Sequence, residues 1–192
     1  MSRRATLAIL DMRLRAENRT LVFSCAGAAV VGIAAPRELA AAISFCSLLG
    51  IIVALVQSPG RFPHLDLCEQ GAPLFGRQLA RAKALVPCAI VGLATLTYVA
   101  AATLAGLRAI PFTLVATLAA VVPTTLTASC ATIRSGAARA LYIAMAAAVA
   151  GAAFTLASVA ASLPGELAFS ALVSFFALRQ YGEALARYDP VT

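Results

Sequence analysis

Hydrophobic residues gather along the chain into long, nearly uninterrupted runs separated by short polar stretches. Six such runs can be delimited, at residues 21–35, 39–56, 84–107, 109–133, 140–163 and 167–178. They lack the alternation of apolar and polar residues that is typical of membrane-spanning β-strands. Because backbone groups in lipid must be bonded within their own segment, the runs predict α-helices.

Composition indicates that the solvent of these helices is lipid. The 192 residues are 61% hydrophobic and 12% charged, and water-soluble domains carry about twice that charge. A helix needs roughly 20 apolar residues to cross the hydrocarbon, so 21–35 and 167–178 are short. Either they extend into flanking residues, with Arg19 or Arg179 reaching the headgroups, or one of them only dips into the membrane. We expect an all-α polytopic membrane protein with a six-helix transmembrane domain over 21–178.

Positive charge predicts the orientation of this domain. With six crossings, thirteen of the 15 cations fall on one side, and only Arg37 and Arg108 fall on the other. Cations in short loops favour the cytoplasmic side, so both termini should be cytoplasmic and the chain should lie in the cell inner (cytoplasmic) membrane. The net charge of +7 then reflects topology and anionic membrane lipids, and no nucleic-acid partner is expected.

The two ends of the chain have distinct patterns. Residues 1–20 place Leu7, Leu10 and Leu14 at helical spacing among arginines. This pattern predicts an amphipathic helix in the cytoplasmic interface, and a basic, frayed leader is the alternative. Residues 179–192 are expected to form a cytoplasmic tail that continues helically until shortly before Pro190.

Several absences restrict the function. No Asp, Glu, Lys, Arg or His lies within the six runs, which argues against ion-coupled transport, although sodium could still use carbonyls and hydroxyls. The five cysteines form no CxxC pair and His64 is the single histidine, so we expect no metal site, no bound cofactor and no catalytic constellation. Because GxxxxGK[ST] is also absent, any ATP hydrolysis should take place on another polypeptide.

The longest predicted cytoplasmic loop, 57–83, contains the charged stretch 66–83, "DLCEQGAPLFGRQLARAK". From Pro73 onward the composition favours a helix. One predicted stripe contains Phe75, Leu79, Ala82 and Val86, and Arg77 and Arg81 share another face. The pattern predicts a short helix that lies on the membrane surface and continues into the third run.

The segment "CEQGAPLFGRQLARAK" resembles the loop between the second and third membrane helices of type-2 ABC exporter permeases. The matching positions are Glu69, Pro73, Leu74, Arg77, Leu79, Ala82 and Lys83. The resemblance extends to the plan of a basic N-terminal helix, six crossings and both ends inside. The brief external stretch 161–167, "ASLPGEL", departs from the family, which often has re-entrant helices there. A juxtamembrane helix without a docking role would also carry Arg and Lys near its ends.

What the resemblance implies is a coupling helix that docks into a groove of an ATPase subunit. It assigns partner binding to Glu69, Pro73, Leu74, Phe75, Gly76, Arg77, Leu79, Arg81 and Lys83. The chain itself would not be an enzyme, because ATP and Mg²⁺ would bind the partner ATPase. A second permease copy or a paralogue would complete the transporter. The alternative is a small membrane-embedded scaffold or assembly factor that binds a cytoplasmic partner without transport.

Hydroxyl side chains follow Pro123 in the fourth run, at Thr124, Thr125, Thr127 and Ser129. They are a possible conduit through the bundle. Hydroxyls of this kind more often bond to a neighbouring helix or to their own backbone, and we favour this second interpretation.

Overall fold

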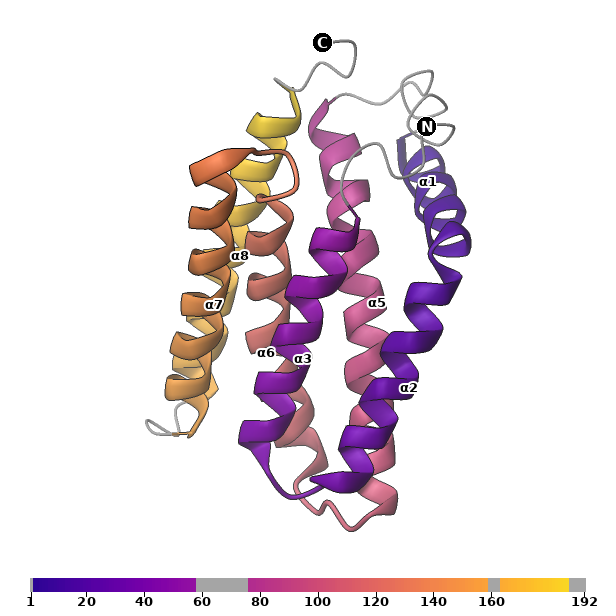
Figure 1. Ribbon diagram of the computed structural model, residues 1–192, viewed down its shortest axis with the longest axis vertical. Helices are drawn as coiled ribbons and strands as arrows, with labels where there is room; N and C mark the ends of the chain where they lie inside the picture. Colours follow the sequence, from indigo (N-terminus) through magenta and orange to yellow (C-terminus); the bar gives the residue numbers. More distant parts are fainter. Residues whose placement is uncertain (1, 58–75, 159–162, 187–192) are drawn as a thin grey trace.

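The computed structural model describes residues 2–57, 76–158 and 163–186, with side chains placed for 7–8, 11–57, 82–158 and 163–185. Within these residues the chain is helical and contains no strand. The helices are α1 (Ser2–Ala16), α2 (Asn18–Ala34), α3 (Leu39–Val56), α5 (Gly76–Leu104), α6 (Ile110–Ser129), α7 (Gly136–Ser158) and α8 (Leu163–Ala186). The all-α prediction is confirmed for this part of the chain (Figure 1).

Each of the six hydrophobic runs corresponds to one helix, and α3 has the predicted bounds. The boundary between the last two runs was wrong. α7 ends at Ser158, and Leu163, which was expected to close the fifth run, is the first residue of α8. Pro164 fits there because the first turn of a helix has no use for its missing N–H group. Glu166 therefore lies inside a helix of the bundle, contrary to the expectation that these helices hold no ionisable group.

Four of the described helices are long and apolar enough to cross a membrane: α3, the part Ala82–Leu104 of α5, α6 and α7. α2 is apolar but shorter, with 17 residues, and α8 is not among the four. Large apolar side chains also face outward, among them Phe23 (77% exposed) and Phe175 (64% exposed). Together these features indicate a membrane protein, because a water-soluble surface rarely carries so much apolar area.

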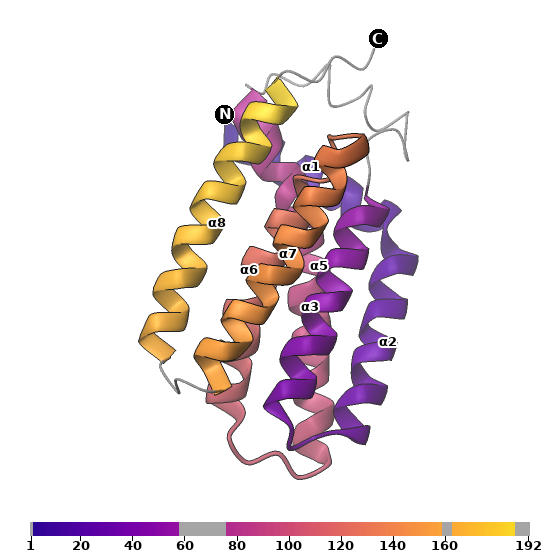
Figure 2. The ribbon, with the colours of Figure 1, turned by 60° about the vertical axis from the view of Figure 1, so that its left-hand side comes forward.

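α5 and α6 organise the bundle (Figures 1 and 2). α2 packs along α5, α3 packs against both α6 and α5, and α7 and α8 pack against α6. The beginnings of α1 and α5 and the end of α8 lie at one end of the bundle (Figure 1). The connections 35–38 and 105–109 lie at the opposite end.

Small residues allow the helices to approach closely. At Gly32 of α2, a Cβ atom would lie 2.5 Å from the carbonyl oxygen of Tyr98 in α5. The buried core is rich in alanine, including Ala28, Ala42 and Ala94. Close packing through small side chains is the usual way in which membrane helices associate.

Candidate functional site

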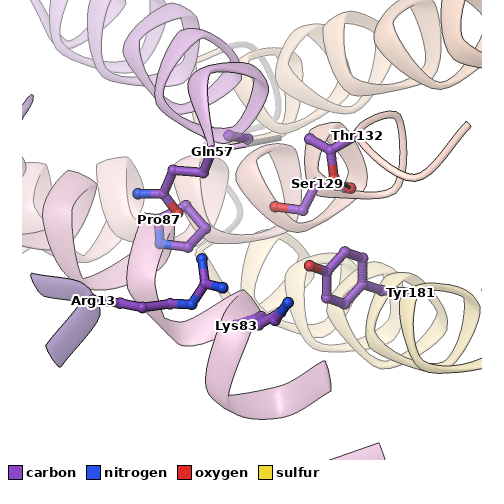
Figure 3. Close-up of a pocket in the computed structure, with 8 residues that line it drawn as sticks. Arg13, Gln57, Lys83, Pro87, Ser129, Thr132 and Tyr181 are labelled. Atoms are coloured by element: carbon purple, nitrogen blue, oxygen red, sulfur yellow. Dashed lines mark hydrogen bonds between the residues drawn. The ribbon is translucent and has the colours of Figure 1, made fainter. Parts of the chain in front are cut away.

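A small polar pocket lies where five segments converge (Figure 3). Its cavity volume is about 20 Å³, which is room for about one water-sized group. The lining residues come from α1, from α3 and its end, from α5, from α6 and the turn after it, and from α8. They are Arg13, Ala54, Gln57, Lys83, Pro87, Ser129, Thr132 and Tyr181.

Two cationic side chains and one buried amide nitrogen line this pocket. The half-buried side chains of Arg13 and Lys83 bring two positive charges to its wall, and their nitrogen atoms point into it in Figure 3. Nε2 of Gln57 is buried and has no hydrogen-bond partner among the described residues. An electron-rich group, such as a water oxygen or an anionic oxygen, is therefore the complementary occupant.

Two of the lining hydroxyl groups are bonded to the backbone of their own segment. The Ser129 hydroxyl donates to the carbonyl of Thr125 at 2.9 Å, and the Thr132 hydroxyl donates to the carbonyl of Ser129 at 2.7 Å. Their oxygens remain able to accept. Pro87 has no N–H to donate to the carbonyl of Lys83 four residues earlier, so the helical ladder of α5 is interrupted at the pocket.

The end of α6 is shaped by tight turns and by one arginine. The N–H groups of Cys130, Ala131 and Thr132 each donate to a carbonyl three residues earlier. Nη1 of Arg134 donates to the carbonyl of Cys130 at 2.7 Å, and its guanidinium lies 4.0 Å from the centroid of the Tyr142 ring. A cation at a helix C-terminus satisfies the last carbonyls, so Arg134 fixes the chain next to Thr132.

The predicted partner-binding residues are divided by the structure. Glu69, Pro73, Leu74 and Phe75 lie outside the described residues. Gly76, Arg77, Leu79 and Arg81 lie in the first turns of α5, where only the backbone is described. Lys83 lines the pocket. The expected continuity between the charged helix and the third run is confirmed from Gly76 onward, because α5 runs without a break from Gly76 to Leu104. Its predicted position on the membrane surface stays a prediction.

The possible conduit residues are all buried in α6. Each hydroxyl donates to the carbonyl four residues earlier: Thr124 to Ala120, Thr125 to Val121 and Thr127 to Pro123 at 2.8 Å, and Ser129 to Thr125 at 2.9 Å. This is the backbone bonding that we favoured from the sequence. Among the four, Ser129 also lines the pocket, and a conduit role for the group stays a prediction.

Sequence reasoning missed several members of the pocket. Arg13 was assigned to the membrane interface alone, and Gln57, Thr132 and Tyr181 were not singled out. Their one signal is position. Gln57, Thr132 and Tyr181 each lie near the end of an apolar run on the side that the cations mark as cytoplasmic, and Arg13 lies in the basic N-terminal stretch on that side. Which of these ends meet laterally depends on helix packing.

Among residues 2–57, 76–158 and 163–186, no group of three or more His, Cys, Asp or Glu could hold a metal ion. His64 and Cys68 lie outside these ranges. No protein-family model, curated protein or solved structure matches the chain.

Proposed function

We propose that the chain is the membrane-spanning permease subunit of an ABC transporter, an exporter driven by a separate ATPase that docks on residues 66–83. The observation that carries this proposal is the continuity of α5. Its apolar part is Ala82–Leu104, and the preceding residues 76–81 extend the same helix and include Arg77 and Arg81. A helix is stiff, so a displacement at its cationic end is carried into the bundle.

At the polar pocket, α5 meets the other segments to which such a displacement would be passed. Lys83 and Pro87 of α5 line the pocket together with residues of α1, α3, α8 and the end of α6. Packed interfaces of this kind respond to a force by switching between discrete arrangements rather than by continuous deformation. Movement of the first turns of α5 would therefore reach every segment that surrounds the pocket.

The assembly that follows from the proposal contains two permease chains, either two copies or one copy and a paralogue, and two ATPase chains. ATP and Mg²⁺ bind the ATPase, and the permease chain catalyses no reaction. The chain lies in the inner membrane with six crossings, with α1 at the cytoplasmic interface and both termini in the cytoplasm. Its outward apolar side chains contact membrane lipids or the second permease chain.

The continuity of α5 supports a separate ATPase as the energy source, whereas the absence of ionisable groups from the apolar runs does not. Glu166 lies inside α8 and is buried, so that absence does not extend to the helices as folded. The scaffold alternative has the same docking segment. It differs in that partner binding would have no consequence for movement of a substrate.

Co-purification tests the docking step. The chain is produced together with the protein encoded in the adjacent reading frame, provided that this protein contains GxxxxGK[ST]. Arg77→Glu combined with Leu79→Asp should reduce the recovered ATPase at least tenfold, which corresponds to about 1.4 kcal/mol. The matched control is Arg108→Glu, an exposed cation at the opposite end of the bundle, which should leave recovery unchanged.

Equal recovery with the double variant and the control would overturn the docking role. If docking holds, nucleotide hydrolysis separates the exporter from the scaffold. A Lys→Ala change in the partner's GxxxxGK[ST] should abolish movement of substrate in the exporter, whereas a scaffold would retain its function with this inactive partner.

A further inference from the structure

Glu166 is a carboxyl group without a partner inside the bundle. It lies in the first turn of α8 and its exposed fraction is 0%. Neither Oε1 nor Oε2 has a hydrogen-bond partner among the described residues. A carboxylate in the first turn of a helix usually bonds to free backbone N–H groups, but here the oxygens make no such bond.

The face of α8 that carries Glu166 is turned toward the other helices. Leu163 and Phe169, three residues before and after Glu166, share this face. Both pack against a cluster of buried residues from α3, α6 and α7, which are Ile43, Ala116, Ala120, Ala153 and Ala157. The surroundings of the carboxyl group are therefore mainly aliphatic.

A second unsatisfied polar group is the hydroxyl of Thr117 in α6, next in sequence to a residue of this cluster. Thr117 follows Ala116 of that cluster, its exposed fraction is 0%, and its Oγ1 has no hydrogen-bond partner among the described residues. Buried hydroxyls in helices usually donate to a carbonyl of the preceding turn, as Thr124 and Thr125 do. Thr117 departs from that pattern in the part of α6 that packs near the start of α8.

Among the described residues, the helices packed around Glu166 bring no counter-ion to it. α6 has no titratable side chain, and α3 has Cys46. α7 carries Arg139 and Tyr142 near its far end. α5 carries Arg77, Arg81 and Lys83 near its start, together with Cys88 and Tyr98, and the Tyr98 hydroxyl donates to the carbonyl of Ala35. The charged residues of the nearby connections are exposed, at Arg37, Glu38 and Arg108. On α8 itself, Arg179, Tyr181 and Glu183 lie several turns away.

We propose that Glu166 is a proton-binding site of this protein, and that it is a neutral carboxylic acid when α8 is packed against α6 and α7. Burial of an unpaired carboxylate is far more costly than burial of the neutral acid, so these surroundings favour the protonated form of Glu166. The proton is released when α8 separates from its neighbours and water reaches the carboxyl group. The proposal goes beyond the docking of an ATPase and does not depend on it.

Two carbodiimides of different polarity test the site on the full-length chain in phosphatidylcholine liposomes. Dicyclohexylcarbodiimide is apolar and adds to protonated carboxylic acids, and a water-soluble carbodiimide reaches carboxyl groups at the surface. Mass spectrometry of peptides locates the N-acylurea that each reagent leaves. Glu38 is the matched control because it is exposed and belongs to the connection 35–38, which lies at the same end of the bundle as the start of α8 (Figure 1).

The apolar reagent should modify Glu166 at least tenfold faster than Glu38, and the water-soluble reagent should show the reverse preference. Modification of Glu166 should decline as the pH is raised. The reverse preference at Glu166, or modification that does not depend on pH, would overturn the proposal. These measurements use the unaltered chain, so they do not depend on whether a variant folds.

Glu166→Gln provides an independent test, because it keeps the shape and removes the titration. The folded wild-type chain holds a proton that the unfolded chain releases, so its apparent Tm should fall as the pH rises. The Glu166→Gln variant should lose this dependence and should be at least as stable as the wild type at high pH. A variant with the same pH dependence as the wild type would contradict the assignment.

Discussion

Gly50 of α3 lies directly against Thr125 of α6, so that a Cβ atom at position 50 would overlap the threonine hydroxyl oxygen. The same hydroxyl donates to the carbonyl of Val121 at 2.8 Å. The missing side chain of Gly50 thus sets how closely α3 and α6 approach. Thr125 is thereby enclosed in the contact between α3 and α6, in keeping with a packing role for its hydroxyl.

Gly50→Ala should therefore destabilise the bundle by about 1–3 kcal/mol, because a methyl group must displace part of α6. The measurement is thermal unfolding of the purified chain in detergent. Gly151→Ala is the matched control, since Gly151 lies in helix α7 and a methyl group at that position would meet nothing within 4 Å. The control should be neutral or slightly stabilising, and equal losses at both positions would refute the close contact.

Tyr98→Phe should lower stability by about 1 kcal/mol. Tyr98 is 1% exposed, and its hydroxyl donates at 2.9 Å to the carbonyl of Ala35, where the chain leaves α2. The substitution leaves this carbonyl with one bond fewer, while the packing of the ring is kept. Tyr142→Phe retains the ring beneath Arg134 and affects a less buried residue, so it should cost less in the same unfolding experiment.

Arg134→Ala should destabilise the end of α6 by about 1–3 kcal/mol, because it removes a charge-assisted hydrogen bond to Cys130 and a cation–π contact with Tyr142. Arg134→Lys should recover only part of the loss, since an ammonium group lacks the planar fork of guanidinium. The measurement is the rate of hydrogen exchange of the 129–134 backbone, which should rise in Arg134→Ala. Arg139→Ala, at an exposed position, is the control and should leave this rate nearly unchanged. Faster exchange in both alanine variants would count against a specific role of Arg134.

Labelling of single cysteines should establish the orientation. Cys25, Cys46, Cys88 and Cys130 are replaced by alanine, which leaves Cys68 of the predicted cytoplasmic loop. A membrane-impermeant maleimide should then react in inverted vesicles but not with intact cells. Arg108→Cys in a chain without the other cysteines should give the opposite result, and labelling of Cys68 on intact cells would reverse the predicted topology.

Much of the local structure was readable from the sequence. Residues 39–56 form a helix with the predicted bounds because polar and proline-containing segments enclose an uninterrupted apolar run. The boundary near Leu163 was wrong because apolar and small residues continue through it, so hydropathy does not mark the turn. Of the candidate site residues, Lys83 and Ser129 meet at one pocket, which their separation of 46 positions does not reveal.

By itself, the sequence determined that the described chain is helical and suited to lipid, and it determined the uneven distribution of positive charge. These properties depend on local composition, because each apolar run satisfies its own backbone hydrogen bonds in lipid. Only the tertiary structure decided that Gly50 meets Thr125, that Arg13 and Lys83 share a pocket, and that Glu166 is buried. Helices that are apolar and rich in alanine on every side carry no stripe to show which face turns inward. Their rotation and neighbours are therefore settled by close packing between segments far apart in the chain.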